Sequence, residues 1–253
     1  AGAITAVGTD AGAAAATNPA AGSGSSAEPA AGAARALLDR ALAAAGGRRA
    51  LAASPAFQWK GMAAVHAGGR DLALAGTWRL VPPRQARVET WERLRGPEST
   101  RTLILDGAAG WTVREGKTAT LAPAFLAHEA AQFHLYALMR LVPLLGPECR
   151  VTALGSDAAG REGLRAACAG YPDADLLFDA DARLVRMVTR LTDPETGREI
   201  VETVDLDGVI ESRGVRWPRT VHLAWDGAPY FDLEILEFEA LKGLEPATFA
   251  PPR

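Results

Sequence analysis

The longest apolar segment of the chain, residues 124–145, has a hydrophobic pattern that predicts a helix. Pro143 should kink or end this helix, because proline lacks the amide that would bond to the carbonyl of Met139. The apolar arc is wider than the roughly 100° that a helix needs on the surface of a core. We therefore expect apolar neighbours on two sides, so the helix is either fully enclosed or covers a groove whose other wall is a sheet. The strong polar side chains share one narrow stripe: Glu129, Gln132, Tyr136 and Arg140.

The N-terminal residues 1–32 have a different composition, dominated by Ala, Gly, Ser, Thr and Pro. Too few large apolar side chains occur there to offset the entropy lost on ordering. We interpret this segment as a flexible leader that either spaces a folded domain from a membrane or cell-wall anchor or has no role. Apolar residues then recur at helical spacing from Ala33 to Ala45, and Gly46-Gly47 should end this helix.

Most of the remaining chain alternates polar and apolar residues with a period of two, which predicts antiparallel strands. Turn residues such as Asp106-Gly107 separate these runs, and residues 215–225 read as one continuous strand. About ten or eleven strands joined by short turns favour an incomplete antiparallel β-barrel capped by helices. The sequence therefore predicts an α+β fold in a single domain over residues 33–253.

The two cysteines lie in a predicted hairpin. Residues 149–154 and 164–169 flank a turn-rich segment, and a turn centred on its middle places Cys149 opposite Cys168. Facing cysteines in neighbouring strands can meet disulfide geometry, so we predict a bond between them. Two buried free thiols are the alternative. A disulfide would favour an oxidising, exported setting.

Composition and charge exclude several classes of protein. The net charge is -3 and no cluster of Lys and Arg stands out, so we expect no nucleic-acid partner. No apolar run reaches the ~20 residues needed to span a bilayer as a helix. The chain begins AGAITAVG, without the basic start and apolar middle of a signal peptide, and we expect that such a peptide has already been removed.

The sequence carries no catalytic signal. His128 and His134 are six residues apart, about 240° around a helix, so they cannot share a zinc ion from one face, and we expect both to be core residues with one hydrogen bond each. No GxSxG and no GxxxxGK[ST] occurs. We therefore predict no enzymatic activity, no cofactor and no metal. A run of aspartates lacks the glycine and glutamate of a calcium loop and is expected to form turns: Asp173, Asp175, Asp179 and Asp181.

Aromatic and aliphatic side chains are what the predicted strands and long helix offer instead. An open sheet that presents such side chains on its concave side, covered by an apolar helix, would shelter an apolar ligand from water. Burial at roughly 25 cal/mol per Å² would give an acyl chain several kcal/mol without polar recognition. The candidate cavity residues are Trp59, Leu74, Trp78, Val88, Trp111, Leu135, Leu138, Met139, Val142 and Phe178.

Several short motifs also occur in an order that is found in a known family. They are GTWRLVPP at 76–83, Leu-Asp-Gly at 105–107 followed by Trp111, the next strand at 116–121, Phe178-Asp179 with Leu184, and Phe-Ala-Pro-Pro at 249–252. In this order they resemble the outer-membrane lipoprotein carriers of the LolA/LolB type, over roughly residues 33–253. The resemblance implies an incomplete antiparallel barrel capped by helices, which binds lipid or acylated protein in its cavity in the periplasm. One departure is Pro82, which stands where LolA-type carriers have an arginine implicated in holding the lid closed.

Two hypotheses for function follow. The leading one is an exported, periplasmic binding protein, tethered to the outer membrane or free, that holds a lipid, acyl chain or lipidated protein between the sheet and helix 124–145. It would act in envelope lipid or lipoprotein trafficking, with envelope proteins of the inner or outer membrane as further partners. The alternative is a non-enzymatic structural module of a cell-envelope assembly, whose concave face is filled by its own side chains.

Overall fold

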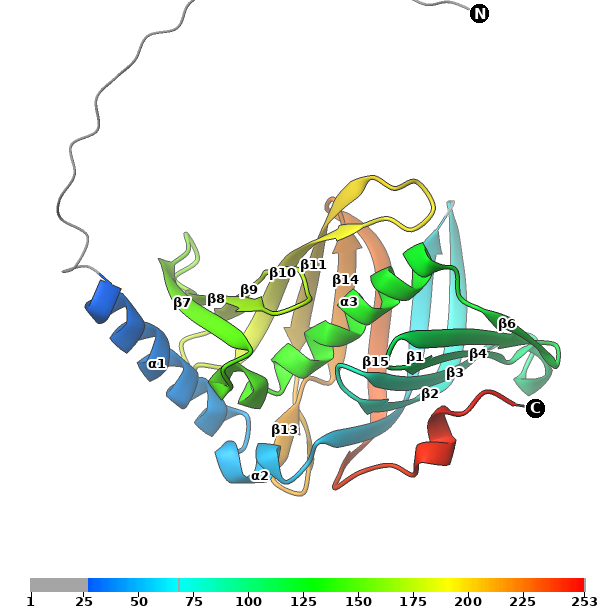
Figure 1. Cartoon of the computed structure of the whole chain (residues 1–253), viewed down its shortest axis with the longest axis horizontal. Helices are drawn as coiled ribbons and strands as arrows, with labels where there is room; N and C mark the ends of the chain where they lie inside the picture. Colours follow the sequence, from blue (N-terminus) through cyan, green and yellow to red (C-terminus); the bar gives the residue numbers. More distant parts are fainter. Residues whose placement is uncertain (1–26, 68, 253) are drawn as a thin grey trace, which may run out of the picture.

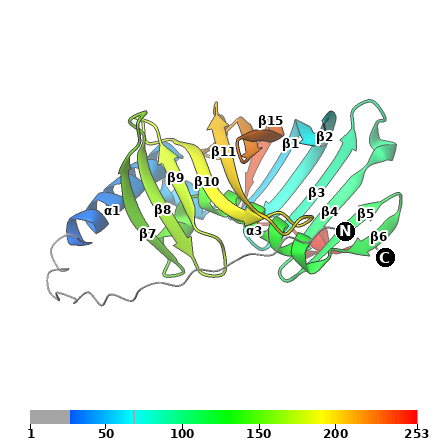
Figure 2. The same cartoon turned by 90° about the horizontal axis from the view of Figure 1, so that it is seen from above.

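A curved sheet of thirteen antiparallel strands dominates the computed structural model, which describes residues 27–67 and 69–252 (Figure 1). The strand order is β6-β5-β4-β3-β2-β1-β15-β14-β11-β10-β9-β8-β7. The two end strands do not pair with each other, so the sheet is an open trough (Figure 2). Its strands are β1 Ala56–Ala67, β2 Arg70–Val81, β3 Gln85–Glu92, β4 Arg101–Asp106, β5 Ala109–Arg114, β6 Lys117–Thr120, β7 Cys149–Ser156, β8 Glu162–Cys168, β9 Ala174–Phe178, β10 Leu184–Thr192, β11 Glu199–Asp207, β14 Thr220–Trp225 and β15 Ala228–Leu241.

Pairing of β1 with β15 holds the two halves of the trough together, because it joins segments far apart in the chain. Most of the other pairs in this sheet join strands that are successive in the chain, through turns of the kind that the sequence predicts, and β11 pairs with β14. The α+β class and the antiparallel sheet are as predicted, whereas the strand number is not: the described residues form fifteen strands and not ten or eleven.

The predicted strand 215–225 is interrupted at Pro218, which has no backbone amide to give to a sheet ladder. Val215–Trp217 (β13) therefore separates from β14 and pairs with Ile210–Ser212 (β12) in a small second sheet.

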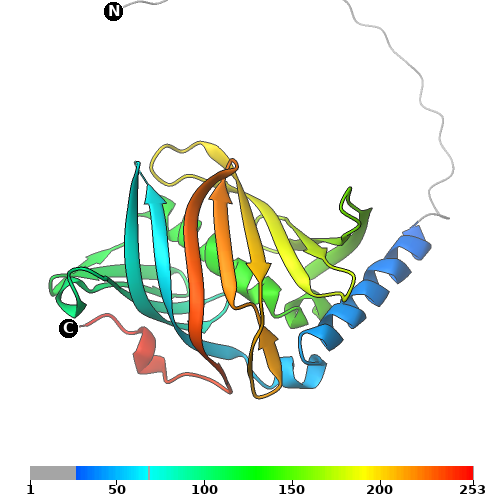
Figure 3. The same ribbon diagram turned by 180° about the vertical axis from the view of Figure 1, so that it is seen from behind.

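Helix α3, Pro123–Met139, lies in the trough of the sheet and crosses several strands (Figure 3). Pro123 occupies the first turn, where its missing amide costs nothing. The helix ends earlier than the predicted 124–145. Leu141 is left-handed with φ 61°, and a separate 3-10 helix, η2 Val142–Leu145, contains Pro143. The missing amide of Pro143 thus ends the helix upstream of the proline and does not merely kink it.

Helix α1, Ala27–Ala44, lies along one end of the trough beside β7, and the short helix α2, Arg48–Ala52, follows it. Residues 27–32 of the predicted leader are therefore helical, and the rest of that segment lies outside the described residues. The turn after α1 requires glycine, because Gly46 has φ +110° and a Cβ there would lie 1.8 Å from the carbonyl oxygen of Gly214. The face of α1 that packs on the core consists of Ala34, Leu37, Leu38, Ala41 and Leu42.

The hairpin of β7 and β8 has the register predicted from the sequence, with Cys149 paired to Cys168, and a disulfide joins them. The two cysteines are 19 residues apart in the chain. Closing a loop of this length stabilises a fold by roughly 3 kcal/mol, through the constraint that it places on the unfolded chain.

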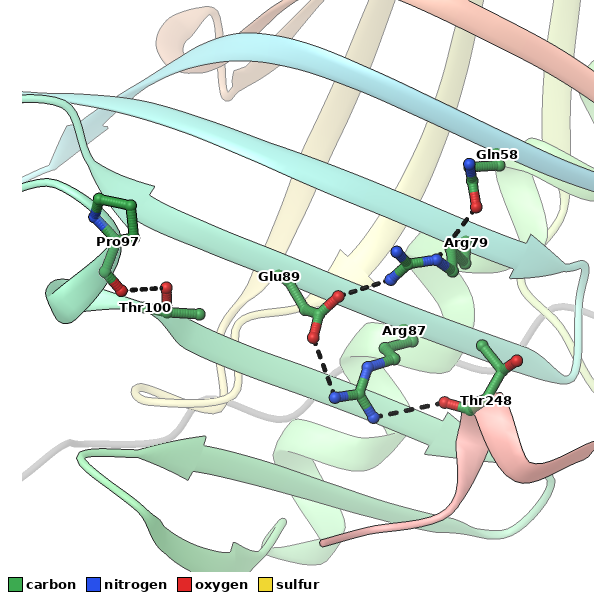
Figure 4. A network of polar contacts seen from close by, with 7 residues as sticks. All are labelled: Gln58, Arg79, Arg87, Glu89, Pro97, Thr100 and Thr248. Carbon is green, nitrogen blue, oxygen red and sulfur yellow. Dashed lines mark hydrogen bonds and ion pairs between the residues drawn. The ribbon is translucent and has the colours of Figure 1, made fainter.

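The convex face of the sheet carries the C-terminal segment, whose 3-10 helix η3 spans Pro246–Phe249 (Figure 4). Arg87 donates to the carbonyl oxygen of Thr248 at 3.4 Å and to Glu89 at 2.9 Å. Arg79 donates to the other Glu89 oxygen at 2.5 Å and to Gln58. This ladder of polar side chains runs across β1, β2 and β3 and attaches the end of the chain to them.

Candidate functional site

A cavity of about 190 Å³ lies between α3 and the concave face of the sheet. One row of paired residues crosses the sheet beneath the helix and supplies much of the floor: Met187, Val204, Leu223, Phe231 and Val65. A second row from the other half of the trough is Trp78, Val88 and Leu103. Both rows arise because alternate side chains of a strand point to the same face, so cross-strand partners share it.

Four of the ten predicted cavity residues line this space: Trp78, Val88, Leu135 and Met139. The other six do not. Trp59 is 1% exposed and lies behind the cavity wall, with its ring 5.4 Å from that of Tyr136 and 6.4 Å from that of Trp78. Leu74, Leu138 and Phe178 are buried in the core, and Trp111 and Val142 are half-buried away from the cavity.

The polar stripe of α3 faces inward over most of its length. Glu129, Gln132 and Tyr136 line the cavity with the apolar residues around them. Arg140, the fourth member, caps the helix C-terminus in the core, where it donates to the carbonyl oxygen of Leu51 at 3.2 Å. The helix thus brings polar groups into an apolar space, where each requires a partner.

Glu202 on β11 is the carboxylate opposite this stripe, and it is 0% exposed. One of its oxygens, Oε2, accepts hydrogen bonds from Gln132 Nε2 and from Trp225 Nε1, both at 2.8 Å. Trp225 is the cross-strand partner of Glu202 on β14, and its indole is stacked on Tyr230 with ring centroids 3.6 Å apart. The other oxygen, Oε1, has no hydrogen-bond partner among the described residues.

Burial and neighbouring carboxylates raise the pKa values of three groups that line the cavity: Glu129, Glu202 and Tyr230. Burial, together with the charge of Glu202, raises the pKa of Glu129 to about 7. Burial also raises the pKa of Glu202, although the hydrogen bonds from Trp225 and Gln132 oppose the shift. The pKa of Tyr230 rises to about 12, chiefly through burial. Near neutral pH the two carboxyl groups therefore hold protons more tightly than exposed glutamates do.

Sequence reasoning identified Glu129, Gln132 and Tyr136 as a stripe but did not place Glu202 near them. A signal for Glu202 exists: it interrupts the inward positions of β11, where Ile200, Val204 and Leu206 are all buried and apolar. A carboxylate at one inward position of an otherwise apolar strand indicates a buried polar group.

A second, larger cavity of about 570 Å³ lies between the C-terminal end of α1, the turn after β9, β11 and β13. Its walls combine apolar residues such as Leu184, Leu206 and Trp217 with charged residues such as Arg183 and Arg216. Met139 lines this cavity as well as the one beneath α3. No pattern along the chain indicates this space, because it forms where segments far apart in the chain meet.

The remaining candidate residues have structural surroundings. His128 donates one hydrogen bond from Nδ1 to the carbonyl oxygen of Thr192, as expected, whereas His134 has no partner among the described residues and is stacked on Tyr171. Asp179 accepts backbone hydrogen bonds that close its turn, as predicted. Within the part of the chain that the structure describes, no three His, Cys, Asp or Glu side chains are placed to hold a metal ion. None of the described helices has the length and apolar character to cross a bilayer.

No protein-family model matches the chain, and no curated protein matches it. Solved structures do. A LolA superfamily protein from Nitrosomonas europaea is similar over 86% of this chain and 97% of its own, with a TM-score of 0.55 and 11% identity. A putative outer membrane lipoprotein-sorting protein domain from Vibrio parahaemolyticus is similar over 85% of this chain and 97% of its own, with a TM-score of 0.55 and 12% identity.

A DUF1329 family protein from Desulfovibrio piger is similar to the same extent, with a TM-score of 0.55 at 10% identity over 86% of this chain and 97% of its own. At such low identity these likenesses concern the fold alone. The chain therefore has the LolA-like fold that its sequence motifs resemble.

Proposed function

We propose that this protein is an exported binding protein that holds the apolar part of a lipid or lipidated protein between α3 and the concave face of the sheet. The observation that carries the proposal is the cavity beneath α3, whose floor is the cross-strand row from Met187 to Val65. Apolar side chains from both walls converge on it, as in sites that shelter apolar ligands. No chemical step is part of this function.

The size of the cavity implies a movement of the helix. A volume of about 190 Å³ is smaller than the roughly 300–1,000 Å³ of typical ligand sites. A long acyl chain would therefore need α3 to move away from the sheet. The helix has no side-chain cap at its N-terminus, and the left-handed Leu141 follows its C-terminus, so neither end continues directly into another helix.

Two further observations support an exported carrier. The Cys149–Cys168 disulfide is of a kind that persists in oxidising compartments outside the cytosol. The Vibrio parahaemolyticus domain with the same fold is described as lipoprotein-sorting. The alternative of a structural module requires a concave face filled by its own side chains, and the cavity beneath α3 does not favour it.

The test is binding of a fluorescent fatty acid together with native mass spectrometry of the protein purified from its own cells. Val204→Phe fills the cavity from its floor and should lower probe affinity at least about tenfold, while overpacking costs ~1–3 kcal/mol of stability. Val188→Phe is the matched control, because Val188 is on β10 at an outward position next to the cavity residue Met187. Equal affinity in the two variants, or a protein without bound lipid that ignores the probe, would contradict the proposal.

A further inference from the structure

Glu202 is positioned as if to receive a hydrogen-bond donor from outside the chain. Its Oε2 is held in place by two donors, Gln132 from α3 and Trp225 from β14. The indole that donates is itself fixed between Tyr230, with which it stacks, and the edge of His128 at 5.5 Å. The carboxylate is therefore preoriented, and Oε1 is left without a partner among the described residues although its side chain is fully buried. A buried acceptor without a donor is costly, so a ligand that supplies one gains affinity.

The charge of the cavity has one sign. Glu129 and Glu202 line it, and no Lys or Arg of the described residues does. Neither carboxylate forms an ion pair within the part of the chain that the structure covers, although fifteen ion pairs of Arg or Lys with a carboxylate occur elsewhere in it. An uncompensated negative charge in an apolar space requires a cation or a proton.

The protonation of the two carboxyl groups depends on their shared surroundings. Burial and the charge of Glu202 raise the pKa of Glu129 to about 7, and burial raises the pKa of Glu202, so the two groups behave as a coupled pair. A ligand with a positive charge would favour their ionised forms, because it supplies the opposite charge that the cavity lacks.

The polar groups around Glu202 suit an ammonium better than a metal ion. An ammonium has three donors, and the two carboxyl groups and the phenol of Tyr136 offer three acceptors in one cavity. Aromatic rings from Tyr136, Tyr230 and Trp78 line the same space, where ring faces attract cations. Calcium takes six to eight oxygen ligands, more than these groups provide.

We infer that the cavity binds the protonated amino group of an amphiphile, with Glu202 Oε1 as the principal acceptor and Glu129 beside it, while the apolar body of the ligand lies on the floor from Met187 to Val65. This inference rests on the proposed function, because it requires the space beneath α3 to be a ligand site. It adds a substrate class to that function: apolar chains that end in an amine, as opposed to those that end in a carboxylate or a hydroxyl.

The test compares three probes with the same alkyl chain by isothermal titration calorimetry at pH 8: dodecylamine and dodecanoate below their critical micelle concentrations, and dodecanol below its solubility limit. We expect dodecylamine to bind at least about tenfold more tightly than dodecanol, and dodecanoate to bind most weakly. Glu202→Gln should reduce the preference for the amine over the alcohol to about twofold or less. Glu129→Gln should reduce it partly and serves as the second variant should Glu202→Gln fail to fold.

The control is Glu239→Gln, which removes one negative charge from an exposed position on β15 and should leave the preference unchanged. Equal binding of the three probes to the native protein would overturn the inference and leave the proposed function standing. A preference for the amine that survives Glu202→Gln and Glu129→Gln would likewise overturn it. Binding of none of the probes would overturn both.

Discussion

Glu89 on the convex face and Glu202 on the concave face are glutamates on strands of one sheet, and their surroundings differ in kind. Glu89 has an arginine for each oxygen, Arg79 and Arg87. Burial alone would raise the pKa of Glu89, but the hydrogen bonds from these arginines outweigh it and leave the pKa lowered. Glu202 has only a neutral amide and an indole on one oxygen, and its pKa is raised.

The difference separates a carboxylate that serves the fold from one that is available to a ligand. Paired charges with a donor on each carboxylate oxygen hold elements together, as Glu89 does between β3, β2 and, through Arg87, the C-terminal segment (Figure 4). A buried carboxylate with a vacant acceptor reduces stability in the absence of a partner. Natural sequences retain such groups where they have a function.

The largest expected effect is on the pH dependence of stability. The pKa of Glu129 is about 7 in the folded protein and 4.5 in the unfolded chain, so the folded protein binds this proton more tightly. The stability from this group is fully present below pH 4.5 and is lost as the pH rises to about 7, a change of up to roughly 3 kcal/mol. Glu129→Gln should remove that loss, measured as urea unfolding free energy at intervals between pH 5 and pH 8.

Other groups that titrate in this range make the comparison with the variant necessary. Burial lowers the pKa of His128 and of His134, which opposes the trend of Glu129 below pH 6.5. Glu202 and Tyr230 line the cavity from the sheet, and Tyr136 lines it from the same helix as Glu129; all three residues are kept in the variant. If the difference in unfolding free energy between the native protein and Glu129→Gln did not change with pH, Glu129 would be hydrated and its pKa would not be raised by the charge of Glu202.

The second effect concerns Glu89, for which the pH dependence of stability has the opposite sign to that of Glu129. Glu89→Gln leaves two half-buried arginines without their carboxylate and should destabilise the fold by about 1–2 kcal/mol at pH 7. Because the pKa of Glu89 is lowered in the folded protein, this stability is present above its unfolded pKa and is lost as the pH falls through the folded one. Thermal unfolding of the native protein and of Glu89→Gln at pH 7 and at pH 3 measures the loss of stability in the variant and its dependence on pH.

Dodecylamine binding distinguishes Glu89 from Glu202 more clearly than stability does. Glu89→Gln should leave the affinity for dodecylamine within about twofold of the native value, because Glu89 is on the convex face. A loss of binding equal to that of Glu202→Gln would show that the two faces are not independent.

A smaller effect is expected from Trp225→Phe, which keeps the aromatic ring but removes the indole donor to Glu202. The lost hydrogen bond should cost about 1 kcal/mol of stability, and the preference for amine over alcohol should weaken because the carboxylate is less firmly oriented. Unfolding by urea and the same three probes provide the measurements. A variant with native selectivity would assign the orientation of Glu202 to Gln132 alone.

Local patterns in the sequence were sufficient for the elements that local physics determines. The helical period of residues 124–139, the turn that sets Cys149 opposite Cys168 and the alternation at Trp78 and Val88 all concern neighbours in the chain or in a hairpin. The order of short motifs along residues 33–253 predicted the LolA-like fold.

The rest depends on which distant strands meet. The inward stripe of α3 and Glu202 on β11 come from segments about 70 residues apart, so neither strand nor helix alone indicates the other. The open trough and the cavity beside α1 have the same origin, whereas the split at Pro218 has a local cause, the missing backbone amide of the proline. Leu138 and Phe178 have the apolar character of cavity residues, yet they pack in the core, because periodicity identifies a buried face without distinguishing solid packing from space.

Met139 lines both cavities. A methionine has three rotatable bonds and no branch, so a partition made of it yields by rotamer change and not by backbone movement. A change of the Met139 rotamer would let the end of a long alkyl chain pass from the smaller cavity into the larger one. The longest ligand that fits would then depend on this one side chain. Met139→Phe should shorten the longest alkylamine that binds tightly, as a homologous series of chain lengths would show.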